Sequence, residues 1–125
     1  MAQDPTGTAS LVVGEEHTAI AVGSGDVPVL ATPWLVALCE RASVATANHV
    51  LGPEETSVGV HVNIEHIAAS VPGATIDATA EILTADGTRL VFSVTAHEGT
   101  RLVGCGTIVR VRVHRDRFTK GLRRS

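Results

Sequence analysis

The segment that most constrains the fold is an apolar stretch that begins at Thr32-Pro33 and meets no helix breaker before Gly52-Pro53. Thr suits the N-cap of a helix and Pro suits its first helical position, so the stretch predicts one long helix. Nearly all of its residues are apolar, and a helix that is apolar around its circumference is stable only where other elements cover most of it. A curved sheet wrapped around the helix meets this need.

A single carboxylate, Glu40, interrupts the first part of this stretch. At about 100° per residue it lies near the middle of an arc of apolar positions, so the pattern predicts that the helix directs it toward the core. Desolvating a carboxylate costs several kcal/mol unless it is paired or protonated, and a carboxylate held in such a place suits a general base. The alternative is a side chain that reaches the rim or pairs with Arg41.

The rest of the chain predicts a sheet. Residues 11–22 are rich in β-branched side chains and end at Gly23-Ser24-Gly25-Asp26, which predicts a first strand followed by a loop. Alternation of apolar residues, with turns at 86–87 and 98–100, predicts four further strands over 58–67, 76–82, 90–94 and 102–113. The expected fold class is α+β, with a curved antiparallel five-stranded sheet around one long central helix.

Strict alternation along the second strand assigns its residues to two faces. The face expected to lie on the helix carries Val58, Val60, Val62, Ile64 and His66. The opposite face carries Gly59, His61, Asn63, Glu65 and Ile67. His66 and Glu40 would then share one interior, although a lone histidine at the end of an apolar face is also common as a satisfied core or rim residue.

Thr32 adds a hydroxyl at the expected start of the helix. Unpaired backbone N–H groups and the positive end of the helix dipole favour a developing anion at that place. The alternative is a plain N-cap, worth about 1 kcal/mol.

Length and composition point to a single domain over residues 1–125, with a loose N-terminus at 1–9 and a basic C-terminal tail at 116–125. The first residues lack the basic and apolar pattern of a signal peptide, so we expect a cytoplasmic location. No apolar run approaches the roughly 18 residues that cross a bilayer, so we expect no membrane partner. Cys39 and Cys105 predict two reduced thiols and no disulfide framework.

Charge is distributed unevenly along the chain. The net charge is −3, yet seven of the ten Lys and Arg residues lie between Arg110 and Arg124. A basic terminus can meet the phosphates of a nucleotide-bearing ligand or simply remain solvated. The three aromatic residues form no cluster, so we expect no nucleic-acid partner. The six histidines show no HxH or HExxH spacing, so we expect no metal.

Several of these residues together resemble a known family. The matching positions are Ala31-Thr32-Pro33, Glu40, Ser57-Val58-Gly59, His66, Pro72-Gly73, Thr95 to Gly99 and Gly104-x-Gly106-Thr107. In this joint spacing, over roughly residues 10 to 118, the chain resembles the fluoroacetyl-CoA thioesterase-like branch of the hotdog-fold superfamily.

The resemblance implies a hotdog fold, usually a homodimer, and an acyl-CoA thioesterase that releases a carboxylic acid and CoA. It implies Thr32, Glu40 and His66 as catalytic residues, and Gly59 and Arg110 as substrate-binding residues. The CoA thioester is the substrate, and no separate cofactor is implied.

Two roles stay open for Glu40, as general base on a water molecule or as nucleophile through a transient anhydride. His66 would protonate the departing thiolate or orient Glu40. Thr32 and the Gly59 backbone N–H would hold the thioester oxygen, worth about 3 kcal/mol per donor.

The sequence also departs from the family pattern. Residues 17–31 contain no aromatic side chain, whereas the fluoroacetyl-specific member carries lid aromatics there. We therefore expect a different acyl group. Trp34 is a candidate to shape the pocket, with a core or dimer-interface aromatic as the alternative.

Two other functions stay open. One is a CoA-binding or acyl-carrier-binding hotdog module without turnover, and the other is an enoyl-thioester hydratase. For the thioesterase, we expect CoA to enter near the subunit boundary of a homodimer, with its phosphates at basic residues such as Arg112 or Arg115.

Overall fold

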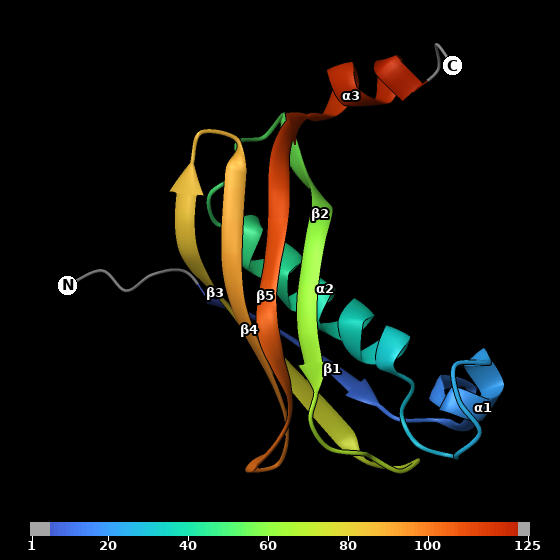
Figure 1. The fold of residues 1–125 in the computed structure, drawn as a ribbon. Helices are drawn as coiled ribbons and strands as arrows, with labels where there is room; N and C mark the ends of the chain where they lie inside the picture. The colour runs from blue at the N-terminus through green and yellow to red at the C-terminus, as the bar shows by residue number, and fades with distance from the viewer. Residues whose placement is uncertain (1–5, 123–125) are drawn as a thin grey trace.

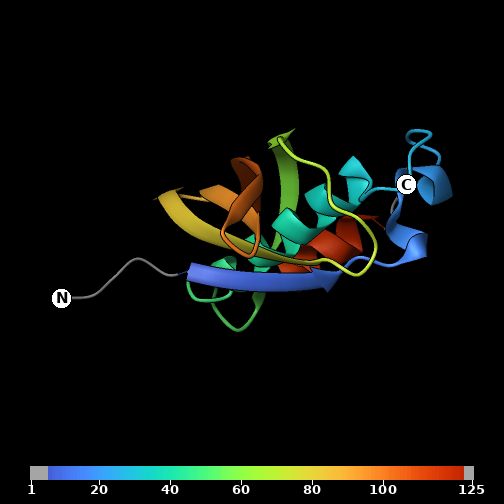
Figure 2. The ribbon, with the colours of Figure 1, turned by 90° about the horizontal axis from the view of Figure 1, so that it is seen from below.

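One helix lies inside the curve of a five-stranded antiparallel sheet (Figures 1 and 2). The computed structural model describes residues 6–122. Its elements are β1 (Thr6–Val12), the 3-10 turn η1 (Glu15–His17), α1 (Ala19–Val22), α2 (Thr32–Ala47), β2 (Glu55–His66), β3 (Thr75–Asp86), β4 (Arg89–Glu98), β5 (Arg101–His114) and α3 (Arg115–Leu122). The strands lie in the order β1-β3-β4-β5-β2. The predicted α+β architecture is therefore confirmed.

The core forms between α2 and the concave face of the sheet. The fully buried residues of α2 include Leu35, Leu38, Cys39 and Ala42, which belong to one cluster with Phe92 of β4. Close approach of β5 to the helix requires a glycine, because a Cβ on Gly104 would lie 2.8 Å from Leu35 Cδ2. Glycine at this position thus lets the sheet wrap tightly around α2.

The prediction that Glu40 points into the core is wrong. Its side chain is 37% exposed and lies at the edge of the side that the sheet covers, beside Gly59 of β2 and Arg110 of β5. Both sides of this helix are apolar, so the hydrophobic pattern could not show which side the sheet covers. No helix within residues 6–122 is long and apolar enough to cross a membrane.

The predicted first strand over residues 11–22 is also wrong. β1 ends at Val12, and two short helical segments follow it. Thr18 caps α1 by accepting a hydrogen bond from the Ala21 N–H at 3.2 Å, and Gly23 ends α1 in the left-handed conformation, with φ at 86°. These two residues stop the β-branched segment from continuing as a strand.

Three element boundaries differ from the predictions. Residues 6–9, expected in a loose N-terminus, belong to β1 and pair with β3. The central helix ends at Ala47 rather than at Gly52. Residues 116–122 of the expected basic tail belong to α3, at the opposite end of the sheet from α1 (Figure 1). Residues 1–5 and 123–125 of the predicted termini lie outside the described part of the chain.

A β-bulge in β2 changes which residues face the helix. Gly59 pairs with Arg110 and His61 pairs with Val109, so Val60 is the extra residue. Strict alternation is broken there, and Gly59 faces α2 together with Val62, Ile64 and His66. The predicted faces are therefore wrong for Gly59, Val58 and Val60, and right for His66.

Candidate active site

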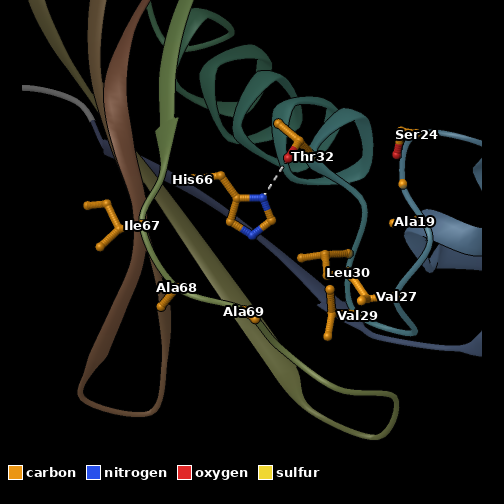
Figure 3. A pocket seen from close by; sticks show the side chains of 11 residues that line it. Ala19, Ser24, Val27, Val29, Leu30, Thr32, His66, Ile67, Ala68 and Ala69 are labelled. Carbon is orange, nitrogen blue, oxygen red and sulfur yellow. Dashed lines mark hydrogen bonds between the residues drawn. The ribbon is translucent and has the colours of Figure 1, made fainter.

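Thr32 and His66 form a hydrogen-bonded pair. Thr32 lies in the first turn of α2 and His66 is the last residue of β2, and Thr32 Oγ1 lies 2.8 Å from His66 Nδ1 (Figure 3). Thr32 is not the N-cap, as the sequence suggested, because Ala31 occupies that position and no side chain caps the helix. The Thr32 hydroxyl forms its hydrogen bond with His66 instead.

The environment of His66 favours its neutral form. Burial lowers the pKa of His66 from its ordinary value of 6.5, and a hydrogen bond to the Ala68 backbone opposes this shift in part. His66 Nε2 is buried and makes no geometrically satisfactory hydrogen bond within residues 6–122. A neutral imidazole has one donor and one acceptor nitrogen, so this ring can exchange a proton with a bound group near neutral pH.

Glu40 belongs to a second cluster, built around Arg110. Glu40 Oε2 lies 3.7 Å from Arg110 Nη1, and the Arg110 side chain is only 8% exposed. Arg110 Nε donates to Ser57 Oγ at 2.8 Å, and Nη2 donates to the Ser57 carbonyl at 3.1 Å. Burial lowers the pKa of Arg110, and the charge of Glu40 opposes this shift. Two β2 contacts thus fix a guanidinium beside the carboxylate.

Gly59 provides the space that the Glu40 carboxylate occupies. A Cβ at this position would lie 2.8 Å from Glu40 Oε2 and 3.4 Å from Arg110 Nη1. The bulge at Val60 brings Gly59 to this face. Any side chain at position 59 would therefore move the carboxylate.

The carboxylate opens onto a groove of about 520 Å³. Arg41, Asn48 and Arg110 contribute polar groups to its walls, and Ala37 and Val44 contribute apolar ones. The volume falls within the range of about 300–1,000 Å³ that is typical of ligand sites. Glu40 is therefore placed to meet a bound molecule, with two guanidinium groups beside it.

The structure does not join these two clusters. Within residues 6–122, no hydrogen bond or ion pair connects Glu40 with Thr32 or His66. Eight residues of helix separate Thr32 from Glu40, which is about 12 Å along the axis. A second cavity of about 280 Å³ lies beside Thr32 and His66. A substrate that meets both clusters must extend along the open side of α2.

Trp34 lines neither of these two cavities. Its side chain is partly exposed and borders a separate shallow depression with Pro33 and Ala37. The ring lies edge-on to His17, with centroids 4.4 Å apart and planes at 75°. Trp34 therefore connects η1 to α2.

Ser57 is a site residue that sequence reasoning did not select. It lies two residues before Gly59, so period-two alternation alone would have placed it on the same face.

The thiols play no evident part, since Cys39 and Cys105 are both free. Burial, with smaller contributions from Cys105 and Glu40, raises the pKa of Cys39 to about 11, so this thiol stays protonated.

We expect Gly59→Ala to lower kcat of the reaction in which Glu40 takes part by about 10²-fold. The added methyl group would displace the Glu40 carboxylate, and a displacement of about 1 Å can cost that much. The folded state should change little in stability, since the clashing atom ends a flexible side chain. Steady-state kinetics and thermal melting measure the two effects. Gly52→Ala is the control, because its Cβ would lie 3.2 Å from Glu55 Oε1, away from the groove. Equal losses in both variants would contradict the assignment.

Comparison with known proteins gives a consistent result. The model of the fluoroacetyl-CoA-specific thioesterase family FlK matches residues 13–116. The fluoroacetyl-CoA thioesterase of Streptantibioticus cattleyicolor is 38% identical over 95 residues, which cover 76% of this chain and 68% of that protein.

Solved structures resemble the whole fold. The structure of the fluoroacetyl-CoA thioesterase FlK has a TM-score of 0.87 and 32% identity, covering 100% of this chain and 97% of that chain. A thioesterase-superfamily protein of Thermus thermophilus has a TM-score of 0.89 and 26% identity, covering 98% and 91%. The structural likeness agrees with the family match, which covers most of the sequence. This chain therefore belongs to the fluoroacetyl-CoA-specific thioesterase family.

Proposed function

We propose that this protein is an acyl-CoA thioesterase that hydrolyses a small acyl-CoA thioester to a carboxylic acid and CoA, with Glu40 as base or nucleophile. The observation that carries the proposal is the position of the Glu40 carboxylate. It faces a groove, has Arg110 at 3.7 Å, and occupies the space left by Gly59. Family membership supports the same chemistry.

Thr32 and His66 take the other roles in this proposal. The Thr32 hydroxyl or the Gly59 N–H holds the thioester oxygen, where charge develops in the transition state. Because these donors belong to separate clusters of one chain, a single oxygen meets both only where they come from different subunits of a homodimer. His66, kept neutral by burial, orients the reacting groups, or it first accepts the proton of the attacking water and then passes that proton to the departing thiolate. Trp34 acts at a distance, by fixing the segment around His17 against α2.

The groove at Glu40 is the proposed site for CoA. Arg41 and Arg110 border it, and Arg112 and Arg115 follow along β5 and α3. Guanidinium groups bind phosphates well, because they present several N–H donors in a fixed plane. A related structure of FlK contains fluoroacetate and CoA, which supports a CoA ester as the ligand.

A homodimer through β2 completes the proposal. β2 is an edge strand, and Val60 and Val62 of this strand are 56% and 37% exposed. An exposed apolar edge strand is a template for pairing with another chain. Pairing of two β2 strands would bring a partner to the uncovered side of α2. Light scattering tests this part, and a stable monomer would contradict it.

A cytoplasmic location stays a prediction. The free thiols of Cys39 and Cys105 agree with a reducing compartment.

The decisive experiment is a panel of acyl-CoA thioesters assayed for release of free thiol. We expect equal amounts of acid and CoA as products. Binding of CoA esters without thiol release would indicate a module without turnover. Loss of the enoyl absorbance with the thioester intact would instead indicate a hydratase.

A further inference from the structure

The cavity beside Thr32 and His66 is a chamber with largely apolar walls. In Figure 3 its side chains come from α1, from the loop before α2, and from the residues that follow β2. Ala19 and Leu30 are buried in its wall, and Val27 and Ile67 are each 51% exposed. It contains no charged carboxylate or guanidinium from residues 6–122, in contrast with the groove at Glu40.

Backbone hydrogen bonds hold the walls in place. The Ala19 N–H donates to the Val29 carbonyl at 2.8 Å, and the Leu30 N–H donates to the Ser70 carbonyl at 2.8 Å. The first bond ties α1 to the loop, and the second ties the loop to the segment after β2. The chamber is therefore formed before a ligand binds, so an apolar group that fits it needs little rearrangement.

The contrast between the two cavities gives the substrate an orientation. Within residues 6–122 the chamber has no carboxylate or guanidinium group in its lining and suits the acyl chain, and the groove with Arg41 and Arg110 suits the charged CoA portion. A thioester carbonyl between them would lie along the open side of α2, with Thr32 and His66 toward the acyl end and Glu40 toward the CoA end.

The size of the chamber sets the length of the acyl chain. Its volume of about 280 Å³ corresponds to about nine groups of the size of a water molecule, at about 30 Å³ each, but the pocket is open to solvent, so part of this volume lies at its mouth and only part can enclose an acyl chain. An acetyl group has three non-hydrogen atoms and leaves most of this space unfilled. We propose that this chamber selects saturated, apolar acyl groups of about four to six carbons, and that Val29 limits the chain length.

This inference rests on the proposed thioesterase function and is tested with acetyl-, butanoyl-, hexanoyl-, octanoyl- and decanoyl-CoA. Each methylene buried in the chamber should raise kcat/KM about fourfold. Butanoyl-CoA should exceed acetyl-CoA by about 15-fold and hexanoyl-CoA by about 200-fold, and the rise should end once the chamber is full. A profile that is flat, or highest for acetyl-CoA, would overturn the proposal.

Val29→Phe tests the wall directly. The larger ring should fill the chamber and lower the ratio of kcat/KM for hexanoyl-CoA to kcat/KM for acetyl-CoA at least tenfold. Val27→Phe is a second variant at an exposed position, which protects the test against misfolding of the first. Val71→Phe is the matched control, since Val71 is 60% exposed and lies outside the chamber. An unchanged profile in both chamber variants contradicts the assignment.

Binding of S-alkyl-CoA thioethers separates this inference from the proposed function. Thioethers cannot be hydrolysed, so their affinity reports on the chamber even in a protein without turnover. Affinity should increase about fourfold per methylene up to six carbons, and Val29→Phe should abolish the increase. If no ester is hydrolysed but this trend holds, the thioesterase proposal fails and the chamber stands. If esters are hydrolysed without the trend, the chamber fails alone.

Discussion

Glu40→Gln lowers kcat for thioester hydrolysis by about 10³-fold, which is the largest effect we expect from one substitution. The amide keeps the size of the side chain and still presents an oxygen atom toward Arg110. It can neither take a proton from water nor attack the thioester carbon. KM should change less than about threefold, because the walls of the groove remain. Release of free thiol at saturating acyl-CoA measures the effect.

Glu55→Gln is a matched control for this result. Glu55 Oε1 lies 3.4 Å from Arg112 Nη1, and its side chain is 32% exposed. β5 therefore carries a second Glu–Arg pair, outside the groove, in which the carboxylate comes from β2 rather than from α2 and is about as exposed as that of Glu40. Its loss should leave kcat within about twofold. Undiminished turnover in Glu40→Gln would remove Glu40 from the chemistry altogether.

Isotopic labelling then separates the two roles of Glu40. A nucleophilic carboxylate forms an anhydride with the acyl group as the thiolate leaves, and water then cleaves this anhydride. Attack of water at the Glu40 carbonyl would leave one ¹⁸O atom in the enzyme after a single turnover in labelled water. A general base, or attack of water at the acyl carbon of the anhydride, would leave the Glu40 carboxylate unlabelled and place ¹⁸O only in the acid product, so label at Glu40 is the result that identifies a nucleophile. Mass spectrometry of the peptide with Glu40 reads the difference.

The sequence pattern predicts the strands well where apolar and polar residues alternate regularly. The strands at 76–82, 90–94 and 102–113 and the turn at Asp86-Gly87 lie within or between observed elements. The segment after β1 fails, because the Thr18 cap and the Gly23 turn override its β-branched composition. The wrongly predicted segment contributes Ala19 to the wall of the chamber, so the alternation of residues could not predict this wall.

For two residues of the candidate site, Glu40 and Gly59, the sequence pattern and the structure give different surroundings. Glu40 was selected as a buried charge, yet it is half-exposed and paired with Arg110. Gly59 was assigned to the wrong face by strict alternation, and a single bulge residue, Val60, places it beside Glu40. A bulge leaves little trace in one sequence, because any residue type can occupy the extra position.

His66→Ala lowers kcat/KM by about 10²-fold or more, the size typical for loss of a proton-transfer group. The control is His61→Ala, because His61 lies on the opposite face of β2 and is exposed. That variant should stay within about twofold of the wild type. Thr32→Val should produce a loss that is not additive with His66→Ala, since the two side chains share one hydrogen bond of 2.8 Å. Full additivity would mean that the pair does not act as a unit.

The pH dependence of the folded state tests the same residue without any substrate. Burial lowers the pKa of His66 below its ordinary value of 6.5, so the unfolded chain binds a proton at this residue more readily than the folded chain. The free energy of unfolding should therefore decrease as the pH falls below 6.5, until the pH passes below the lowered pKa of the folded state. His66→Ala removes this contribution, so urea denaturation at pH 5.5 and 7.5 should differ less in the variant than in the wild type. A variant with the same pH difference as the wild type would show that His66 is not held neutral by burial, and its proposed role in proton transfer would lose its physical basis.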